Sequence, residues 1–135
     1  MSEVENLQVG TEAAFHAVLR IVNETSANLP ITLQIAGSLV SGTLIPSSQY
    51  NHAQALAHAS QASGEAAHVA EALGQVFAQR VVAEKANGFP DLEFAYLEKA
   101  QIFNGMSKGV PTGGVLWQLK TSSVEGFFFG KLAET

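Results

Sequence analysis

The sequence predicts an α+β protein, in which an N-terminal helix precedes a small, bent, five-stranded antiparallel sheet or partly open barrel. A long Ala-rich helical insertion is expected between the second and third strands. Apolar residues recur with a helical period near the N-terminus and alternate like a strand after residue 30, while strand signals vanish between residues 48 and 87. Because strands and helices cluster along the chain rather than alternate, the class is α+β and not α/β.

The first predicted helix begins at Thr11, which is a suitable N-cap residue. Four apolar residues then share one helix face: Phe15, Val18, Leu19 and Val22. This helix is expected to end between residues 23 and 28, with Pro30 marking the exit. Residues 1–10 show no periodicity and are expected to fray.

A β-hairpin is predicted next. Ile31, Leu33 and Ile35 alternate with polar residues, Gly37 is a natural turn residue, and residues 39–45 form the returning strand. Gly42 lies inside that returning strand. A glycine within a strand indicates a bulge or a sharp bend.

Residues 48–87 are predicted to be a helical insertion in two parts. Residues 49–62 form a weakly amphipathic helix, and Ser63 is a plausible N-cap for a second one. Five residues of the second helix follow helical spacing: Val69, Leu73, Val76, Phe77 and Arg80. Asn87-Gly88 followed by Pro90 is a strong helix stop.

Three further strands are predicted over residues 92–103, 115–120 and 124–132. Residues 104–114 are rich in glycine and are expected to form a loop, whereas residues 121–123 are a tight connection. No internal repeat or linker divides the chain, so residues 1–135 are expected to form a single domain.

Composition excludes several classes of function. The chain has no cysteine, so thiolate chemistry and disulfides are absent, and its formal net charge is −5 with only 7 Lys and Arg residues. Proteins that bind nucleic acid usually carry a basic surface, so no nucleic acid is expected as a partner. No apolar run approaches a membrane span, and the N-terminus does not resemble a signal peptide. The expected location is therefore the cytoplasm, with no membrane partner.

The sequence contains no convincing catalytic or metal site. Residues 105–109 match G-x-S-x-G, but a nucleophile elbow needs a following helix and a later histidine, and all four histidines lie at or before position 68. We therefore assign no catalytic role to Ser107. His52, His58 and His68 lie in the helical insertion and are interpreted as histidines on a helix surface. We predict no catalytic residue, no metal and no cofactor.

The last predicted strand carries three adjacent phenylalanines. If Phe128 faces the interior, Phe127 and Phe129 face the other way between Glu125 and Lys131. That arrangement is typical of an interface patch, with an apolar centre and charged rims. Alternatively, the N-terminal helix covers at least one of the two rings, and the opposite orientation of the three rings also remains open.

Four aromatic residues are our candidate interaction residues: Tyr50, Trp117, Phe127 and Phe129. Charged residues make up only 14% of the chain, and the insertion is rich in alanine. A surface with so little charge favours self-association, so we expect a homo-oligomer.

One stretch, "LQIAGSLVSGTL", resembles the first motif of Sm-like RNA-binding barrels, with apolar alternation, a turn glycine, and another glycine in the bent second strand. An N-terminal helix before five strands also fits that fold. The resemblance implies a barrel-like geometry, and an Sm-like nucleic-acid-binding module is the alternative function.

A second resemblance covers almost the whole chain. Three blocks together resemble the gas vesicle accessory protein U (GvpU) family: "LPITLQIAGSLVSGTLIPSSQY", "FAYLEKAQIFNG" and "GVLWQLKTSSVEGFFFGKL". The resemblance implies a non-enzymatic cytoplasmic protein that assists the formation or organisation of gas vesicles. It implies as partners the gas vesicle shell or other accessory proteins.

Overall fold

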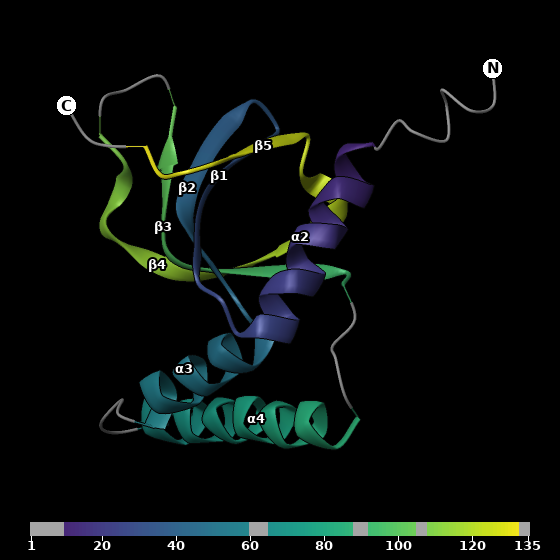
Figure 1. The fold of residues 1–135 in the computed structure, drawn as a ribbon. Helices are drawn as coiled ribbons and strands as arrows, with labels where there is room; N and C mark the ends of the chain where they lie inside the picture. The colour runs from purple at the N-terminus through teal and green to yellow at the C-terminus, as the bar shows by residue number, and fades with distance from the viewer. Residues whose placement is uncertain (1–9, 60–64, 88–91, 105–107, 133–135) are drawn as a thin grey trace.

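The structure, a computed structural model, describes residues 10–59, 65–87, 92–104 and 108–132. The elements run in the order α2 (Thr11–Thr25), β1 (Leu29–Ile35), β2 (Ser38–Ile45), α3 (Ser47–Ala59), α4 (Glu65–Asn87), β3 (Phe94–Phe103), β4 (Val110–Lys120), the 3₁₀ turn η1 (Thr121–Ser123) and β5 (Gly126–Phe129). Figure 1 shows these elements. The predictions for residues 1–9, for an N-cap at Ser63 and for a stop at Gly88 and Pro90 lie outside the described residues.

The predicted α+β class is confirmed. The five strands form one sheet in the order β4-β3-β2-β1-β5, and all neighbouring strands are antiparallel. The sheet is strongly bent but not closed, because β4 and β5 are its two edges. Helix α2 packs beside the sheet, and α3 and α4 lie together at one end of it (Figure 1).

Helix α2 forms for the predicted reason but begins with a different cap. Phe15, Leu19 and Val22 are its buried residues, as their spacing predicts. The N-cap is Gly10, whose carbonyl oxygen accepts a hydrogen bond from the Ala14 N–H at 2.9 Å, so the prediction of Thr11 as the cap was wrong. At the other end, Ser26 adopts a left-handed conformation that ends the helix.

The predicted hairpin is confirmed. Strands β1 and β2 pair from Leu29↔Leu44 to Ile35↔Ser38, which leaves a two-residue turn. Both turn residues have positive φ, +50° at Ala36 and +81° at Gly37. A turn of this kind matches the right-handed twist of the two strands it joins.

The bulge predicted at Gly42 is present, although the extra residue belongs to the partner strand. Ser41 pairs with Gln101 and Thr43 with Glu98, so two residues of β3 lie opposite Gly42. A Cβ atom on Gly42 would lie 3.1 Å from the Ala100 Cα, tighter than most contacts. Glycine at this position therefore lets β3 bulge against β2.

The insertion is helical, as predicted, but the residues that follow helical spacing in its second helix do not share one buried face. Val69, Leu73 and Val76 are exposed, whereas Ala70 and Gly74 are buried. Alanine and glycine allow two helices to approach closely, so the small side chains of α4 lie in the α3–α4 contact. Val69, Leu73 and Val76 consequently face away from it, whereas the Phe77 ring lies 6.2 Å from the ring of Tyr50 in α3.

The C-terminal strands depart from their predicted bounds. Strand β4 begins at Val110, so the predicted loop over residues 104–114 is wrong for its last five residues. Between the pairs Ile102↔Val110 and Ala100↔Val115, residues 111–114 lie opposite Gln101 alone, so this part of the strand is strongly bulged. Strand β5 is shorter than predicted, because the chain leaves the sheet after Phe129.

The core lies between α2 and the face of the sheet that it covers. Fully buried side chains there include Phe15, Ile31, Leu33, Leu44 and Leu97. Trp117 and Phe127 pack against the same cluster while remaining half-buried. The face of β5 that carries Phe127 is therefore the core face.

Candidate functional site

The three phenylalanines of β5 have three different environments. Phe127 packs on Phe15 of α2, with ring centroids 5.5 Å apart. Phe129 lies on the same face, 5.9 Å from the Phe127 ring, but 61% of it is exposed. Phe128 points to the opposite face and is 48% exposed. Helix α2 thus covers one of the two rings, and the other extends beyond the helix.

The C-terminal residues hold β5 in place from the opposite face of the sheet. The buried Thr32 hydroxyl donates to the Gly130 carbonyl oxygen at 2.8 Å and lies 3.2 Å from the Ser41 hydroxyl. Ser41 Oγ also accepts a hydrogen bond from the Leu132 N–H at 2.8 Å. These bonds hold the chain against the sheet just beyond the exposed rings, so the position of β5 is well defined.

The other two predicted interaction residues are less accessible. Tyr50 is buried between Tyr96, at a centroid distance of 4.7 Å, and Phe77, at 6.2 Å. Its hydroxyl oxygen accepts a hydrogen bond from Gln54 Nε2 at 2.9 Å. Trp117 is half-buried against the core. The structure therefore does not bring the four predicted residues together, and of these four Phe129 alone is largely exposed.

A second apolar surface lies on the helical insertion. A groove of about 380 Å³ between α3 and α4 is lined by His52, Ala55, Leu56, Glu71, Gly74, Gln75 and Ala78. Leu56, which is 59% exposed, lines this groove, whereas the exposed Val69, Leu73 and Val76 of α4 are not among the lining residues. The weak amphipathicity of both helices concealed this surface in the sequence.

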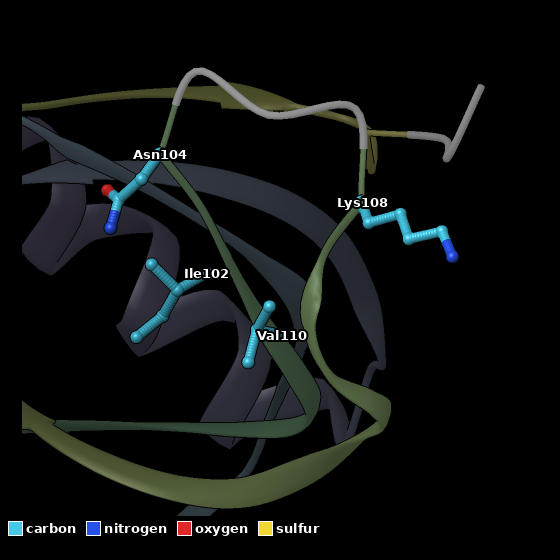
Figure 2. Close-up of a pocket in the computed structure, with 4 residues that line it drawn as sticks. All are labelled: Ile102, Asn104, Lys108 and Val110. Carbon is cyan, nitrogen blue, oxygen red and sulfur yellow. The ribbon is translucent and has the colours of Figure 1, made fainter.

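A third, smaller hollow lies at the end of the sheet where β3 and β4 approach each other. Ile102, Asn104, Lys108 and Val110 line a space of about 250 Å³. Figure 2 shows Asn104 at the end of β3 and Lys108 just before β4, with the apolar side chains of Ile102 and Val110 farther along the two strands. Among the described residues that line this hollow, Lys108 alone carries a charge.

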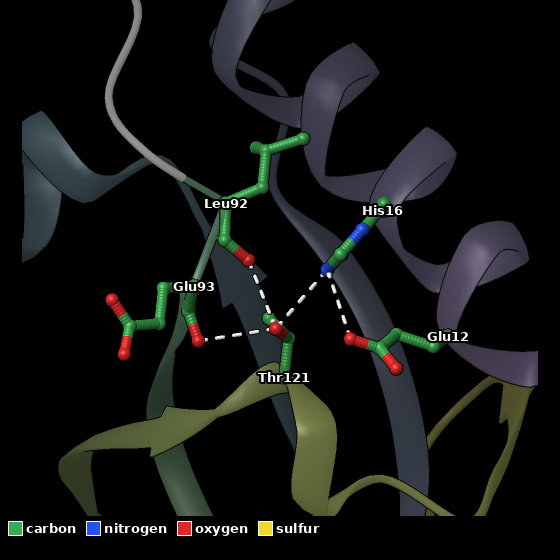
Figure 3. Close-up of polar contacts among 5 residues, drawn as sticks. All are labelled: Glu12, His16, Leu92, Glu93 and Thr121. Atoms are coloured by element: carbon green, nitrogen blue, oxygen red, sulfur yellow. Dashed lines mark hydrogen bonds and ion pairs between the residues drawn. The ribbon is translucent and has the colours of Figure 1, made fainter.

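A polar cluster that resembles a catalytic arrangement joins α2 to the sheet (Figure 3). His16 Nε2 lies 3.2 Å from Thr121 Oγ1 and 3.9 Å from Glu12 Oε1. A catalytic triad needs the carboxylate on the ring nitrogen that does not face the hydroxyl, whereas here one nitrogen faces both groups. The Thr121 hydroxyl also lies within hydrogen-bond distance of the carbonyl oxygens of Leu92, at 2.9 Å, and Glu93, at 3.1 Å. The buried Thr121 thus acts as an anchor for α2.

The described residues hold no group of three or more histidine, aspartate or glutamate side chains placed to bind a metal ion. No helix in this part of the chain is long and apolar enough to cross a membrane. Ser107 lies outside the described residues.

Comparison with known proteins identifies one family. The family model described as "Gas vesicle protein GvpU-like" matches residues 12–132, which is nearly the whole chain. The match begins in α2 and ends just after β5, so it includes every described element. No curated protein and no solved structure matches the chain significantly.

Proposed function

The chain belongs to the GvpU-like family of gas vesicle proteins, and from this premise we propose that it is a non-enzymatic accessory protein of gas vesicles. It assists their formation or organisation through protein–protein contacts. Its partners are components of the vesicle shell or other accessory proteins, together with further copies of the chain. Its place in the cell is the cytoplasm, in association with the vesicles.

The observation that supports a role in protein contacts is the exposure of Phe128 and Phe129 on an edge strand. Burying a phenylalanine completely stabilises a complex by about 1.5–3 kcal/mol, and roughly half of each ring is already covered. Covering the rest of both rings therefore contributes on the order of 2 kcal/mol. Aromatic side chains with charged neighbours are typical of the centre and rim of an interface.

No observation favours the alternative of an Sm-like nucleic-acid-binding module. The described basic residues are spread over several elements: Arg20 in α2, Arg80 and Lys85 in α4, Lys99 in β3, Lys108 just before β4, Lys120 in β4 and Lys131 just after β5. A protein that tracks a nucleic-acid backbone gathers such residues along one groove.

Flotation tests the proposed function. Cells that make gas vesicles are lysed gently and centrifuged, and the buoyant layer is blotted for the protein. We expect the unmodified chain in this layer and at least about tenfold less of the double variant Phe128→Glu/Phe129→Glu, because charged side chains oppose burial at an interface. Phe127 is left unchanged, since its contact with Phe15 belongs to the core.

Val110→Glu is the matched control for this experiment. Val110 is as exposed as Phe129, at 61%, and lies in the other edge strand. Val110→Glu adds one glutamate where the double variant adds two, so it is compared with the single variant Phe129→Glu, which carries the same charge. Val110→Glu should float like the unmodified chain. Recovery of the unmodified chain only below the buoyant layer would contradict vesicle association, and an equal loss for Val110→Glu would contradict a special role for β5.

A further inference from the structure

Two buried hydroxyl groups contact the chain just beyond β5. They belong to Thr32 of β1, which is fully buried, and to Ser41 of β2, which is 2% exposed and lies directly opposite Thr32. Thr32 Oγ1 is 2.8 Å from the Gly130 carbonyl oxygen and 3.2 Å from Ser41 Oγ. Ser41 Oγ accepts a hydrogen bond from the Leu132 N–H at 2.8 Å. These four groups form one connected set.

Chemistry fixes the direction of the hydrogen bonds in this set. A carbonyl oxygen only accepts, and a hydroxyl group has a single hydrogen, so Thr32 donates to Gly130 and cannot also donate to Ser41. The contact between the two hydroxyl groups is therefore made by the hydrogen of Ser41. The bonds run from the Leu132 N–H through Ser41 and Thr32 to the Gly130 carbonyl group, and the chain from Gly130 to Leu132 closes them into a loop. We call this closed loop of hydrogen bonds the hydroxyl latch.

The hydroxyl latch holds the C-terminal end of β5. At the other end, the Glu125 N–H donates to the Gln34 carbonyl oxygen at 2.8 Å. The Gly130 N–H donates to the Pro30 carbonyl oxygen at 2.9 Å, after which the chain leaves the sheet at Gly130, whose φ is +111°. Beyond this point the latch joins the described chain to β2, where no strand pairing does so.

The two exposed phenylalanines lie next to the latch. Phe128 is directly opposite Thr32, and Phe129 immediately precedes Gly130. Phe127 is fixed by its contact with Phe15, whereas 48% of Phe128 and 61% of Phe129 are exposed. Side chains with so much exposed surface have few neighbours to hold them. Their arrangement consequently depends on how the end of β5 is held.

From these observations we propose that Thr32 and Ser41 are positioning residues of the aromatic surface on β5. While the latch is closed, Phe128 and Phe129 are held in one arrangement. When it opens, residues 130–132 leave the sheet and the end of β5 frays. A preorganised surface binds its partner more tightly, because less conformational freedom is lost on binding. This inference rests on the proposed function, since it states how the surface described there is held ready for a partner.

Amide hydrogen exchange measures the latch directly in the purified chain. Ser41→Ala removes the acceptor of the Leu132 N–H, so this amide should exchange at least about tenfold faster than in the unmodified chain. Thr32→Val deletes a hydroxyl group at nearly constant volume and leaves that acceptor in place. It should still raise the Leu132 rate at least about threefold, because the closed loop is broken elsewhere. The amides of the β1–β2 hairpin report on the whole fold, and the Leu132 rate is compared with theirs.

Thr43→Val is the matched control for Thr32→Val. Thr43 lies in β2 two residues after Ser41, and its hydroxyl group makes no hydrogen bond within the part of the chain that the structure describes. The substitution is the same but does not touch the latch. The Leu132 rate should stay within about twofold of that in the unmodified chain.

Flotation then tests whether the latch serves the aromatic surface. Thr32→Val should be recovered in the buoyant layer at least about threefold less than the unmodified chain, because its surface is no longer preorganised. Thr43→Val should float like the unmodified chain. Thr32→Ser keeps the hydroxyl group and should also float like it, which a role of Thr32 in packing alone would not produce. Thermal unfolding checks that each variant is folded.

The two measurements separate this inference from the proposed function. If the unmodified chain does not float, the proposed function is contradicted, while the exchange rates still test the latch. The latch is overturned if Leu132 exchanges no faster in Ser41→Ala or in Thr32→Val than in Thr43→Val. The positioning role is overturned if Thr32→Val floats as well as the unmodified chain, or if Thr32→Ser floats no better than Thr32→Val.

Discussion

Individual glycines decide how the sheet is bent. Lys99 is the extra residue of β3 relative to both neighbouring strands, and it has a left-handed backbone with φ of +53°. Gly42 of β2 and Gly114 of β4 lie against this bulge from either side. A Cβ atom on Gly114 would collide with the backbone of Lys99. The bulge therefore exists because both neighbours lack side chains where β3 protrudes.

Gly114→Ala and Gly113→Ala separate this steric effect from backbone strain. Both glycines have positive φ, +77° and +82°, so alanine costs about 1–2 kcal/mol at either position. Only at Gly114 does the added methyl group meet the Lys99 backbone, whereas at Gly113 nothing lies within 4 Å. In urea unfolding, Gly114→Ala should lose at least about 2 kcal/mol more than Gly113→Ala, by analogy with overpacked cores. Equal losses would show that the bulge does not depend on Gly114.

At the level of elements, the helical insertion shows that the buried face of a helix need not be its most hydrophobic face. Helix α4 places Ala70 and Gly74 against α3 and leaves Val69, Leu73 and Val76 exposed. Tyr50 of α3 meanwhile joins both the Phe77 ring and the Tyr96 ring. The two helices are thus held to each other by small residues and to the sheet by an aromatic cluster.

Ala70→Leu and Val69→Leu test this arrangement on adjacent residues of one helix. Ala70 is 6% exposed, so the larger side chain of leucine must displace its neighbours and should destabilise the protein by about 1–3 kcal/mol. Val69 is 62% exposed, and leucine there should change the free energy of unfolding by no more than about 0.5 kcal/mol. Thermal or urea unfolding measures both. If Val69→Leu proved the more harmful change, the observed face of α4 would be wrong.

Hydrophobic patterns in the sequence were sufficient to predict some elements of the fold and not others. The stripe of Phe15, Leu19 and Val22, and the alternation of Ile31 and Leu33, predicted α2 and the hairpin, because one face of each is clearly apolar. Helix α4 has apolar or small residues all round, so spacing alone could not tell which face is buried. Residues 110–114 read as a loop because glycine and proline dominate a bulged strand. The exposure of Phe129 depends on where α2 ends over the sheet, which no local pattern encodes.

At the scale of the whole molecule, the residues that close the core differ from the aromatic residues that stay exposed on β5. Helix α2 closes the core through Phe15 and Leu19 and is linked to the insertion by Asn23, whose Oδ1 accepts a hydrogen bond from the Ser47 N–H at 3.1 Å. The Phe15–Phe127 contact joins this core to β5. Phe128 and Phe129 of β5 do not belong to this core cluster, so substitutions at these two positions are expected to spare the fold.

Urea unfolding at two protein concentrations distinguishes residues that stabilise the core from residues that would join two copies of the chain. A partner that binds only the folded chain raises its apparent stability, so the urea midpoint of the unmodified protein should rise with concentration if β5 pairs with a second copy. Leu19→Ala, at a buried position, should lower the free energy of unfolding by about 2–5 kcal/mol at every concentration, and its midpoint should still rise with concentration. Ile21→Ala, exposed on the same helix, should change the free energy of unfolding little.

Phe129→Glu should behave in the opposite way, because it leaves the core intact and removes the contact between copies. Its midpoint should equal that of the unmodified protein at low concentration and stay constant as concentration increases. A rise that persists in Phe129→Glu would show that the copies meet elsewhere on the surface.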